Sequence, residues 1–221
     1  MNNEALNRVL AEKGLQLRAL DEDHCLEAFD CGQDPRMTDW FCSTAHRWQQ
    51  EDLCRVWVIS PLDNESKPLG FFTLSAAQII PAQVARSERA AHSANRPWAN
   101  ALQGAFPALL LGKFALDQDV QGSGLGAMLM LGAFAKHVQA SDAAGIKFLI
   151  LNVREERLVS YYCTEYGFIA STSTATDPVR TASQSSRRRQ SVTPIEKKSI
   201  STPLYRSTAA IRADLNAVLE P

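Results

Sequence analysis

Hydrophobic positions alternate along parts of this chain and recur at helical spacing along others, so the pattern predicts both strands and helices. Leu15–Leu20 alternates as a strand does. Arg55–Ser60 and Leu69–Ala76 are apolar runs on either side of a polar turn, which predicts an antiparallel hairpin. Two longer runs, 108–116 and 145–153, predict further strands. The second is apolar on both faces, as expected for a strand in the middle of a sheet.

Apolar residues at helical spacing predict the helices. Gly32 is a plausible C-terminal cap for the short helix predicted at residues 24–29. The aromatic residues Trp40, Phe41 and Trp48 lie roughly on one face of a helix with Ala45, which predicts that they pack into the core. The predicted helices cover residues 4–13, 24–29, 38–50, 124–139, 155–166 and 208–219, and short strands are predicted at 167–170 and 202–207.

The apolar run at 109–117 leads into a segment with glycines at positions 122, 124 and 126, and a new apolar-periodic stretch follows at once. This order indicates a strand, a loop that exposes its backbone, and the start of a helix. Glycines let backbone N–H groups approach a ligand closely, and a helix start presents unpaired donors and the positive end of its dipole. The segment therefore predicts a phosphate-binding site.

Three kinds of phosphate site compete for this segment. A P-loop requires a Lys followed by Ser or Thr after the glycines, and none is present. A dinucleotide-binding loop fits Gly122, Gly124 and Ala127. However, that loop belongs in the first unit of a parallel sheet, with an acidic residue ending the next strand, whereas here several strands precede it and the next strand ends in Asn152. The pyrophosphate loop of coenzyme A enzymes, Q/R-x-x-G-x-G/A, matches Gln121–Gly126.

The order of elements resembles the GNAT N-acetyltransferases, and more narrowly the GNAT toxins of toxin–antitoxin systems, which acetylate aminoacyl-tRNA. The resemblance covers about residues 15–170. It rests on Phe29–Gly32 with Trp40 soon after, Gly70–Ser75, Leu111–Asp117, Gln121–Gly126 and Tyr166–Phe168. It implies an α/β (α+β) GNAT fold, whose mixed, mostly antiparallel sheet splays in a V between the strands ending near Leu116 and Asn152, with helices flanking the sheet.

The resemblance also implies acetyl-CoA as the cosubstrate and assigns the residues that bind it. Backbone groups of the strand before the loop would pair with the pantetheine arm, and N–H groups of the loop would bind the pyrophosphate. Asn152 would orient the pantetheine or the amine. The residues assigned to the strand and the loop are Phe114, Ala115, Leu116, Gln121, Gly122, Ser123, Gly124, Leu125 and Gly126.

The general acid of the family is a tyrosine, and the spacing around it departs from the family pattern. In the family an aromatic–Tyr pair is followed by three residues and then Gly-Phe, whereas here four residues separate Tyr162 from Gly167. Counting forward from Asn152 places the general acid at Tyr162, and counting backward from Gly167 places it at Cys163. We favour Tyr162, because the forward count crosses no gap and a phenol can protonate the departing thiolate.

Charge and composition limit the partners, cellular location and metals that we expect for this protein. The net charge of −1 over 221 residues argues against a global attraction to nucleic acid or membrane, so any basic surface must be local. The N-terminus has no signal-peptide pattern, and no apolar stretch is long enough to span a membrane. An odd number of cysteines, five, without CxxC pairs or zinc spacing, suggests a reducing cytoplasm, and the four histidines show no metal spacing, so we assign no metal.

We expect one GNAT domain over residues 1–221, with a core at 15–170, a C-terminal strand and helix at 202–219, and a flexible basic insertion at 171–201. Residues 81–107 form a second irregular excursion. Basic residues of the insertion could contact the tRNA backbone, and Arg86, Arg89 and Arg96 could add to them. The insertion's basic residues are Arg180, Arg187, Arg188, Arg189, Lys197 and Lys198.

Three functions stay open at this point. The first is a toxin-type acetyltransferase of aminoacyl-tRNA. By family resemblance it would require an antitoxin, with a ribbon-helix-helix protein as the candidate, and would form a homodimer. The second is an acetyltransferase of a small amine or a protein N-terminus. The third is a non-catalytic coenzyme-A-binding or interaction module.

Overall fold

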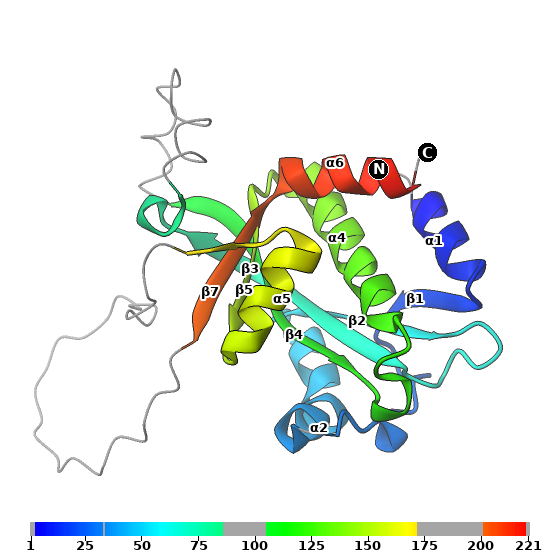
Figure 1. Ribbon diagram of the computed structural model, residues 1–221. Helices are drawn as coiled ribbons and strands as arrows, with labels where there is room; N and C mark the ends of the chain where they lie inside the picture. The colour runs from blue at the N-terminus through cyan, green and yellow to red at the C-terminus, as the bar shows by residue number, and fades with distance from the viewer. Residues whose placement is uncertain (1–2, 33, 86–104, 172–200, 220–221) are drawn as a thin grey trace, which may run out of the picture.

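The computed structural model describes residues 3–32, 34–85, 105–171 and 201–219, and over these residues the chain forms one seven-stranded sheet with helices on both faces (Figure 1). The strands lie in the order β1-β2-β3-β4-β5-β7-β6. They are β1 (Leu15–Ala19), β2 (Arg55–Pro61), β3 (Gly70–Ile79), β4 (Phe106–Leu116), β5 (Phe148–Val153), β6 (Ile169–Ala170) and β7 (Thr202–Ser207). Every neighbouring pair is antiparallel except β4 and β5, which are parallel.

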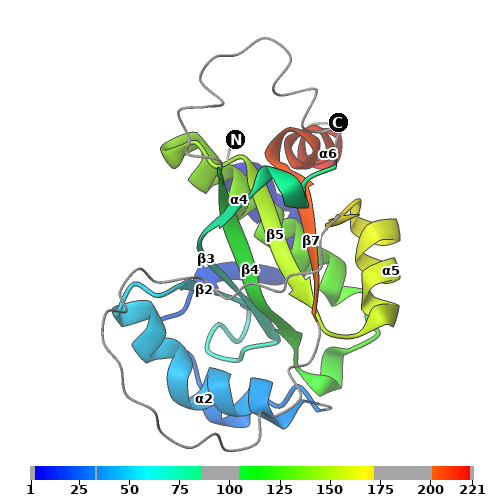
Figure 2. The same ribbon diagram turned by 90° about the vertical axis from the view of Figure 1, so that its left-hand side faces the viewer.

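Helices α1, α4 and α6 cover one face of the sheet, and α2 covers the other (Figures 1 and 2). The helices are α1 (Asn3–Ala11), α2 (Pro35–Gln50), α4 (Leu125–Ala144), α5 (Glu156–Tyr166) and α6 (Thr208–Leu219), and the 3-10 turns are η1 (Leu26–Ala28), η2 (Pro81–Gln83) and η4 (Gln118–Val120). Among the described residues, no helix is both long and apolar enough to cross a membrane.

Two cores hold the sheet between these layers. Under α4 the fully buried side chains include Leu129, Met130 and Leu149. Under α2 the rings of Phe41 and Phe71 stack with their centroids 4.0 Å apart. Each fully buried side chain of this size contributes about 1.5–3 kcal/mol through the hydrophobic effect.

The parallel strands β4 and β5 separate along their length, and this separation creates the candidate site. In the described part of the chain they pair only over Ala108–Leu110 and Phe148–Ile150. Just beyond, β4 carries a bulge, because Gly112 and Lys113 together face Thr73 of β3. The Thr73 hydroxyl accepts the Lys113 N–H at 3.0 Å. A bulge bends its strand, so β4 leaves β5 at this point and the V-shaped splay is confirmed.

Most predicted elements are present with shifted ends. The helix expected at 38–50 begins at Pro35, because proline is well suited to the first turn of a helix. The strand expected from residue 145 begins at Phe148, since Gly145 caps α4 with a φ of 71°. The helix expected at 24–29 is only the turn η1. Phe41 and Ala45 are buried as predicted, whereas Trp48 is 37% exposed.

Three expectations fall on residues outside the described ranges. They concern most of the 81–107 excursion, most of the 171–201 insertion, and the arginines and lysines assigned to both segments.

Candidate active site

The glycine loop between β4 and α4 has an open backbone. Gly122 and Gly124 have φ values of 77° and 86°, and a Cβ at either position would have no neighbouring atom within 4 Å. Among the described residues, the N–H groups of Gly122, Gly124 and Gly126 have no hydrogen-bond acceptor. The predicted order of a strand, a loop with an exposed backbone and the start of a helix is therefore present, and unpaired N–H groups at a helix start are suited to binding an anion.

The other three loop residues are already engaged. The N–H groups of Gln121, Ser123 and Leu125 make long hydrogen bonds of 3.4 Å within the loop and the preceding turn. The side-chain amide of Gln121 donates to the carbonyl oxygens of Cys31 at 3.0 Å and Leu116 at 3.1 Å. The Gln121 side chain therefore holds the loop in place and leaves the glycine N–H groups as the free donors.

The β5-facing edge of β4 is open beyond Leu110. Phe114, Ala115 and Leu116 pair with β3 on their other side, and β5 has already diverged. An unpaired strand edge can pair with an extended chain as an added strand would. The three residues assigned to pantetheine binding are thus brought to one open edge, although the carbonyl of Leu116 is occupied by Gln121.

Two adjoining cavities occupy the space between the diverging strands. The first, of about 160 Å³, is mostly apolar, and its walls include Phe114, Leu158, Asn152 and Tyr162. The second, of about 500 Å³, is polar, and its walls include Asp34, Arg36, Arg154 and Ser201. Met37, Gly112, Lys113, Asn152 and Arg154 line both, so the two cavities form one cleft.

Tyr162 lies in the wall of this cleft, and Cys163 is not among the residues lining either cavity. Burial raises the pKa of Tyr162 to about 12, with a further contribution from neighbouring Tyr161. Among the described residues the Tyr162 hydroxyl makes no hydrogen bond, whereas Tyr161 is 45% exposed and its hydroxyl lies 3.1 Å from that of Tyr166. Tyr162 therefore stays protonated at neutral pH and faces the cleft.

The end of α5 shows how the four-residue spacing is accommodated. The carbonyl of Tyr162 accepts N–H groups from Gly167, five residues later, and from Phe168 at 3.2 Å. An ordinary helix cap with its left-handed residue at Gly167 would use the carbonyl of Cys163. The wider, π-type turn takes up one residue more, which is the number by which the spacing exceeds the family pattern.

The polar cavity carries positive charge. Lys113 extends over the ring of Trp40, with its Nζ 4.6 Å from the ring centroid. Burial lowers the pKa of Lys113, and Arg154 lowers it further, whereas Asp34 opposes the shift. The carboxylate of Asp34 forms an ion pair with Arg36, with Oδ1 3.2 Å from Nε.

Sequence reasoning missed several cleft residues, among them Arg36, Met37, Lys113 and Arg154. The signal for Lys113 was Gly112, because a glycine within a strand pattern often marks a bulge. The other three are brought in by the packing of α2 against the sheet and by the end of β5, and their sequence surroundings carry no comparable signal. In the described ranges, no group of three or more His, Cys, Asp or Glu side chains is placed to hold a metal ion.

The splayed parallel pair, the bulge and the glycine loop at the start of α4 define the GNAT acetyltransferase fold. Comparison with known proteins agrees. A tyrosine-to-phenylalanine variant of the toxin AtaT, bound to the C-terminus of the antitoxin AtaR and acetyl-CoA, has a TM-score of 0.61 and 20% identity, covering 94% of this chain and 99% of that one. AtaT complexed with acetyl-methionyl-tRNAfMet has a TM-score of 0.66 and 21% identity, covering 90% and 98%.

Sequence comparison gives a shorter match. No protein-family model matches the chain. A curated relative, the tRNA-acetylating toxin of Mycobacterium tuberculosis (strain ATCC 25618 / H37Rv), is 32% identical over 56 residues, which are 25% of this chain. The match spans 34% of that relative, about a third of its length. The chain thus has the fold of the GNAT toxins and resembles them in sequence over a limited stretch.

Proposed function

We propose that this protein is an acetyl-CoA-dependent N-acetyltransferase that acetylates the α-amine of aminoacyl-tRNA and so acts as a toxin-type inhibitor of translation. The observation that carries the proposal is the open edge of β4 beyond Leu110. It borders a cleft that Tyr162 lines, and the same strand leads into the loop whose glycine N–H groups have no acceptor among the described residues. These are the parts that acyl transfer from a thioester requires.

The residues present suit acetyl-CoA as the acetyl donor. The N–H groups of Gly122, Gly124 and Gly126 would bind the pyrophosphate of coenzyme A, and the edge at Phe114–Leu116 would pair with the pantetheine arm. Asn152 lines both cavities, where its amide would orient the pantetheine or the incoming amine. Bound acetyl-CoA supplies a thioester, an acyl group on a good leaving group.

Tyr162 would act as the general acid. Its raised pKa keeps the phenol protonated, and it has no partner that would compete for its proton among the described residues. Its role is to donate that proton to the departing sulfur of coenzyme A. In an apolar cleft a charged thiolate is costly, so the sulfur leaves more readily as a neutral thiol.

The acceptor is supported by charge and by the relatives. Lys113, Arg36 and Arg154 line the polar cavity, and cationic side chains bind the phosphates of RNA. One AtaT structure is of AtaT complexed with acetyl-methionyl-tRNAfMet, and the curated relative is named for tRNA acetylation. By analogy we also propose a cytoplasmic location, a homodimer, and a neutralising antitoxin partner of the ribbon-helix-helix class.

The decisive experiment incubates the protein with labelled acetyl-CoA and total charged tRNA. We expect label on aminoacyl-tRNA, its loss with Tyr162→Phe and its retention with Cys163→Ala. Label on free amines or peptides but not on charged tRNA would instead identify an acetyltransferase of small amines or protein N-termini. Tight binding of coenzyme A without turnover on any amine would leave a binding module, and loss only with Cys163→Ala would overturn the choice of general acid.

A further inference from the structure

The polar cavity contains cations but no free carboxylate to accept a proton from an incoming amine. Among its described lining residues the basic side chains are Arg36, Lys113 and Arg154, and the single carboxylate, Asp34, is paired with Arg36 at 3.2 Å. Many amine-modifying sites use a carboxylate or a histidine as the general base. Among the described lining residues there is no histidine, and the one carboxylate is the paired Asp34, so no unpaired base of this kind lines the described cleft.

Lys113 lines the apolar cavity together with Tyr162. Its ammonium group is held in place by the Trp40 ring at 4.6 Å. Arg154 lines both cavities too, so a ligand that bridges the cavities meets positive charge from two elements. The charged or titratable groups around Lys113 are Asp34, Arg36, Cys54, Arg154 and Tyr162.

We propose that this cation set selects acceptor amines of low basicity: the pocket repels the ammonium form, and the amine enters and reacts as the free base. The inference rests on the proposed function and refines its acceptor. An α-amine has a pKa of about 7.7–8.0 and a lysine side chain about 10.4, so at pH 7 roughly a tenth of the first but well under a thousandth of the second is uncharged. The pocket therefore favours the α-amine of an aminoacyl group over lysine side chains.

The transfer balances without a further base. The amine leaves one proton in bulk water before it enters. The nitrogen then bonds to the acetyl carbon, the carbon–sulfur bond breaks with its electron pair on sulfur, and Tyr162 gives its proton to that sulfur. The second proton of the nitrogen returns to the Tyr162 oxygen through water. Acetylated amine and free thiol leave, and Tyr162 is protonated again.

The test is the pH dependence of kcat, whose acid limb reports the ionisation of the bound amine. Initial rates would be measured with three acceptors of different basicity: alanine methyl ester, alaninamide and n-propylamine. We expect the wild-type acid limb to lie about one pH unit below the solution pKa of each amine. We also expect n-propylamine to be acetylated far more slowly than the ester at pH 7.

Charge variants of the pocket make the test specific. Lys113→Met keeps an unbranched side chain over Trp40 but removes its charge, and we expect it to raise the acid limb by about one pH unit. Lys113→Arg should leave the limb near the wild-type position. Asp34→Asn, which removes the opposing charge, should lower it, and Arg154→Gln should raise it, so two variants outside β4 test the proposal if Lys113→Met folds poorly.

Two results would count against different claims. If the acid limb is the same in the wild type, Lys113→Met, Asp34→Asn and Arg154→Gln, the pocket does not set the ionisation of the amine, and the inference is wrong while the acetyltransferase stands. If the wild type acetylates no amine and no charged tRNA at any pH, the proposed function itself is wrong, and the inference falls with it.

Discussion

The carboxylate of Asp117, at the end of β4, accepts the backbone N–H of Asp30 at 3.1 Å, although 87 residues separate the two. The same carboxylate accepts the N–H of Asp119 at 3.0 Å, and the Asp30 carbonyl accepts the N–H of Gln118 at 2.8 Å. Two motifs that the sequence shows separately, Phe29–Gly32 and Leu111–Asp117, are thus one structure beneath the glycine loop.

Asp117→Ala is expected to destabilise the fold and weaken coenzyme A binding. It would leave the N–H groups of Asp30 and Asp119 without their acceptor beside a residue that is only 6% exposed, at a cost of about 2–4 kcal/mol. Urea denaturation and acetyl-CoA titration would measure both effects. Asp119→Ala, at the neighbouring exposed side chain, is the control and should change neither by much. Equal effects of the two substitutions would argue against the anchoring role.

Tyr162→Phe is expected to lower kcat by about 10²- to 10⁴-fold with little change in stability. The hydroxyl makes no hydrogen bond within the described part of the chain, so its removal leaves no partner unpaired. Tyr161→Phe, one position away, removes only the contact with the Tyr166 hydroxyl and should retain activity. Steady-state kinetics and thermal denaturation of both variants would check this. A normal kcat for Tyr162→Phe would exclude the phenol as the acid.

Gly124→Ala and Gly145→Ala are a matched pair at the two ends of α4. Both glycines are left-handed, with φ values of 86° and 71°, and neither would bring a Cβ within 4 Å of another atom. Each substitution should cost about 1–2 kcal/mol of stability through backbone strain. Only Gly124→Ala should also weaken acetyl-CoA binding, by about tenfold, which is about 1.4 kcal/mol. Calorimetric titration showing equal affinities would remove the loop from the coenzyme site.

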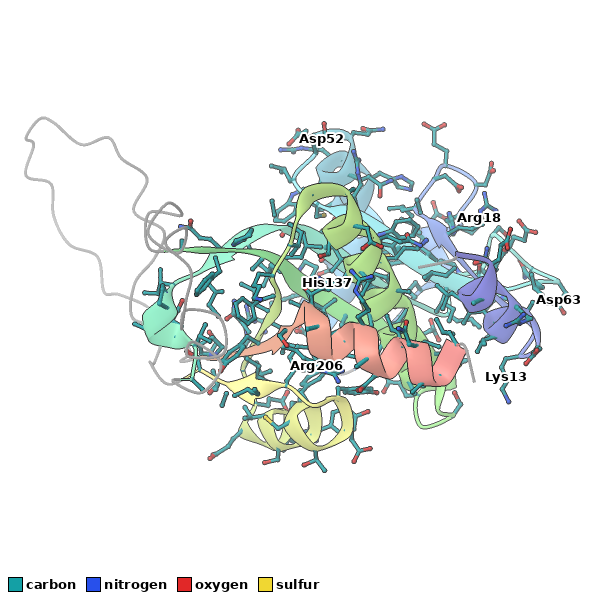
Figure 3. All side chains as sticks on the ribbon, turned by 90° about the horizontal axis from the view of Figure 1, so that it is seen from above. Lys13, Arg18, Asp52, Asp63, His137 and Arg206 are labelled. Carbon is teal, nitrogen blue, oxygen red and sulfur yellow. The ribbon has the colours of Figure 1, made fainter. Side chains whose placement is uncertain are left out.

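Gly167→Ala should be more damaging than its φ of 63° alone implies. A Cβ there would lie 3.3 Å from Nη2 of Arg206, whose side chain is buried and is labelled in Figure 3. The Arg206 side chain also pairs with Asp214 and lies over the Phe134 ring. Because Gly167 caps the turn onto the Tyr162 carbonyl, a shift there would move Tyr162, the proposed general acid.

The control for this position is Gly14→Ala, which has a φ of 70° and open space around it. We expect Gly167→Ala to cost about 1–3 kcal/mol more stability than Gly14→Ala and to lower kcat, whereas Gly14→Ala should leave kcat unchanged. Denaturation curves and kinetics of the pair would show this. Equal losses of stability would mean that Arg206 yields without cost.

The buried side chain of His137 lies on α4 (Figure 3), and we expect it to make the folded state less stable in acid. Thr208 donates to the Ile146 carbonyl at 2.9 Å, so its oxygen accepts from His137 Nε2 at 2.8 Å, and the buried Nδ1 has no partner. Burial lowers the pKa of His137 from 6.5 to about 4.

Between these two values the unfolded chain binds more protons, so stability rises with pH there and is lost as the pH falls from about 6.5 toward 4. The loss attributable to His137 is about 3 kcal/mol. His137→Gln removes the titration, and its denaturation curves at pH 4.5 and 7 should differ less than those of the wild type. An unchanged difference would assign the acid sensitivity to other groups.

The sequence predicted the local elements well, because strand and helix periods and glycine turns are properties of short segments. The hairpin β2–β3, the long strand β4, the helix after the glycine loop and the final helix all follow from such patterns. Helix and strand ends were less predictable, as at Pro35 and Phe148, where caps compete with the hydrophobic pattern.

By itself, the sequence determined the glycine loop and the backbone N–H groups that would bind a coenzyme. This is because glycines at alternate positions expose their own backbone, whatever packs around them. Only the tertiary structure decided which side chains share the cleft. The bulge at Gly112 and Lys113 separates β4 from β5, and the start of α2 brings Asp34 and Arg36 to the opening. The wide turn onto the Tyr162 carbonyl fixes how α5 ends. These relationships depend on pairing and packing between residues far apart in the chain, which no local pattern encodes.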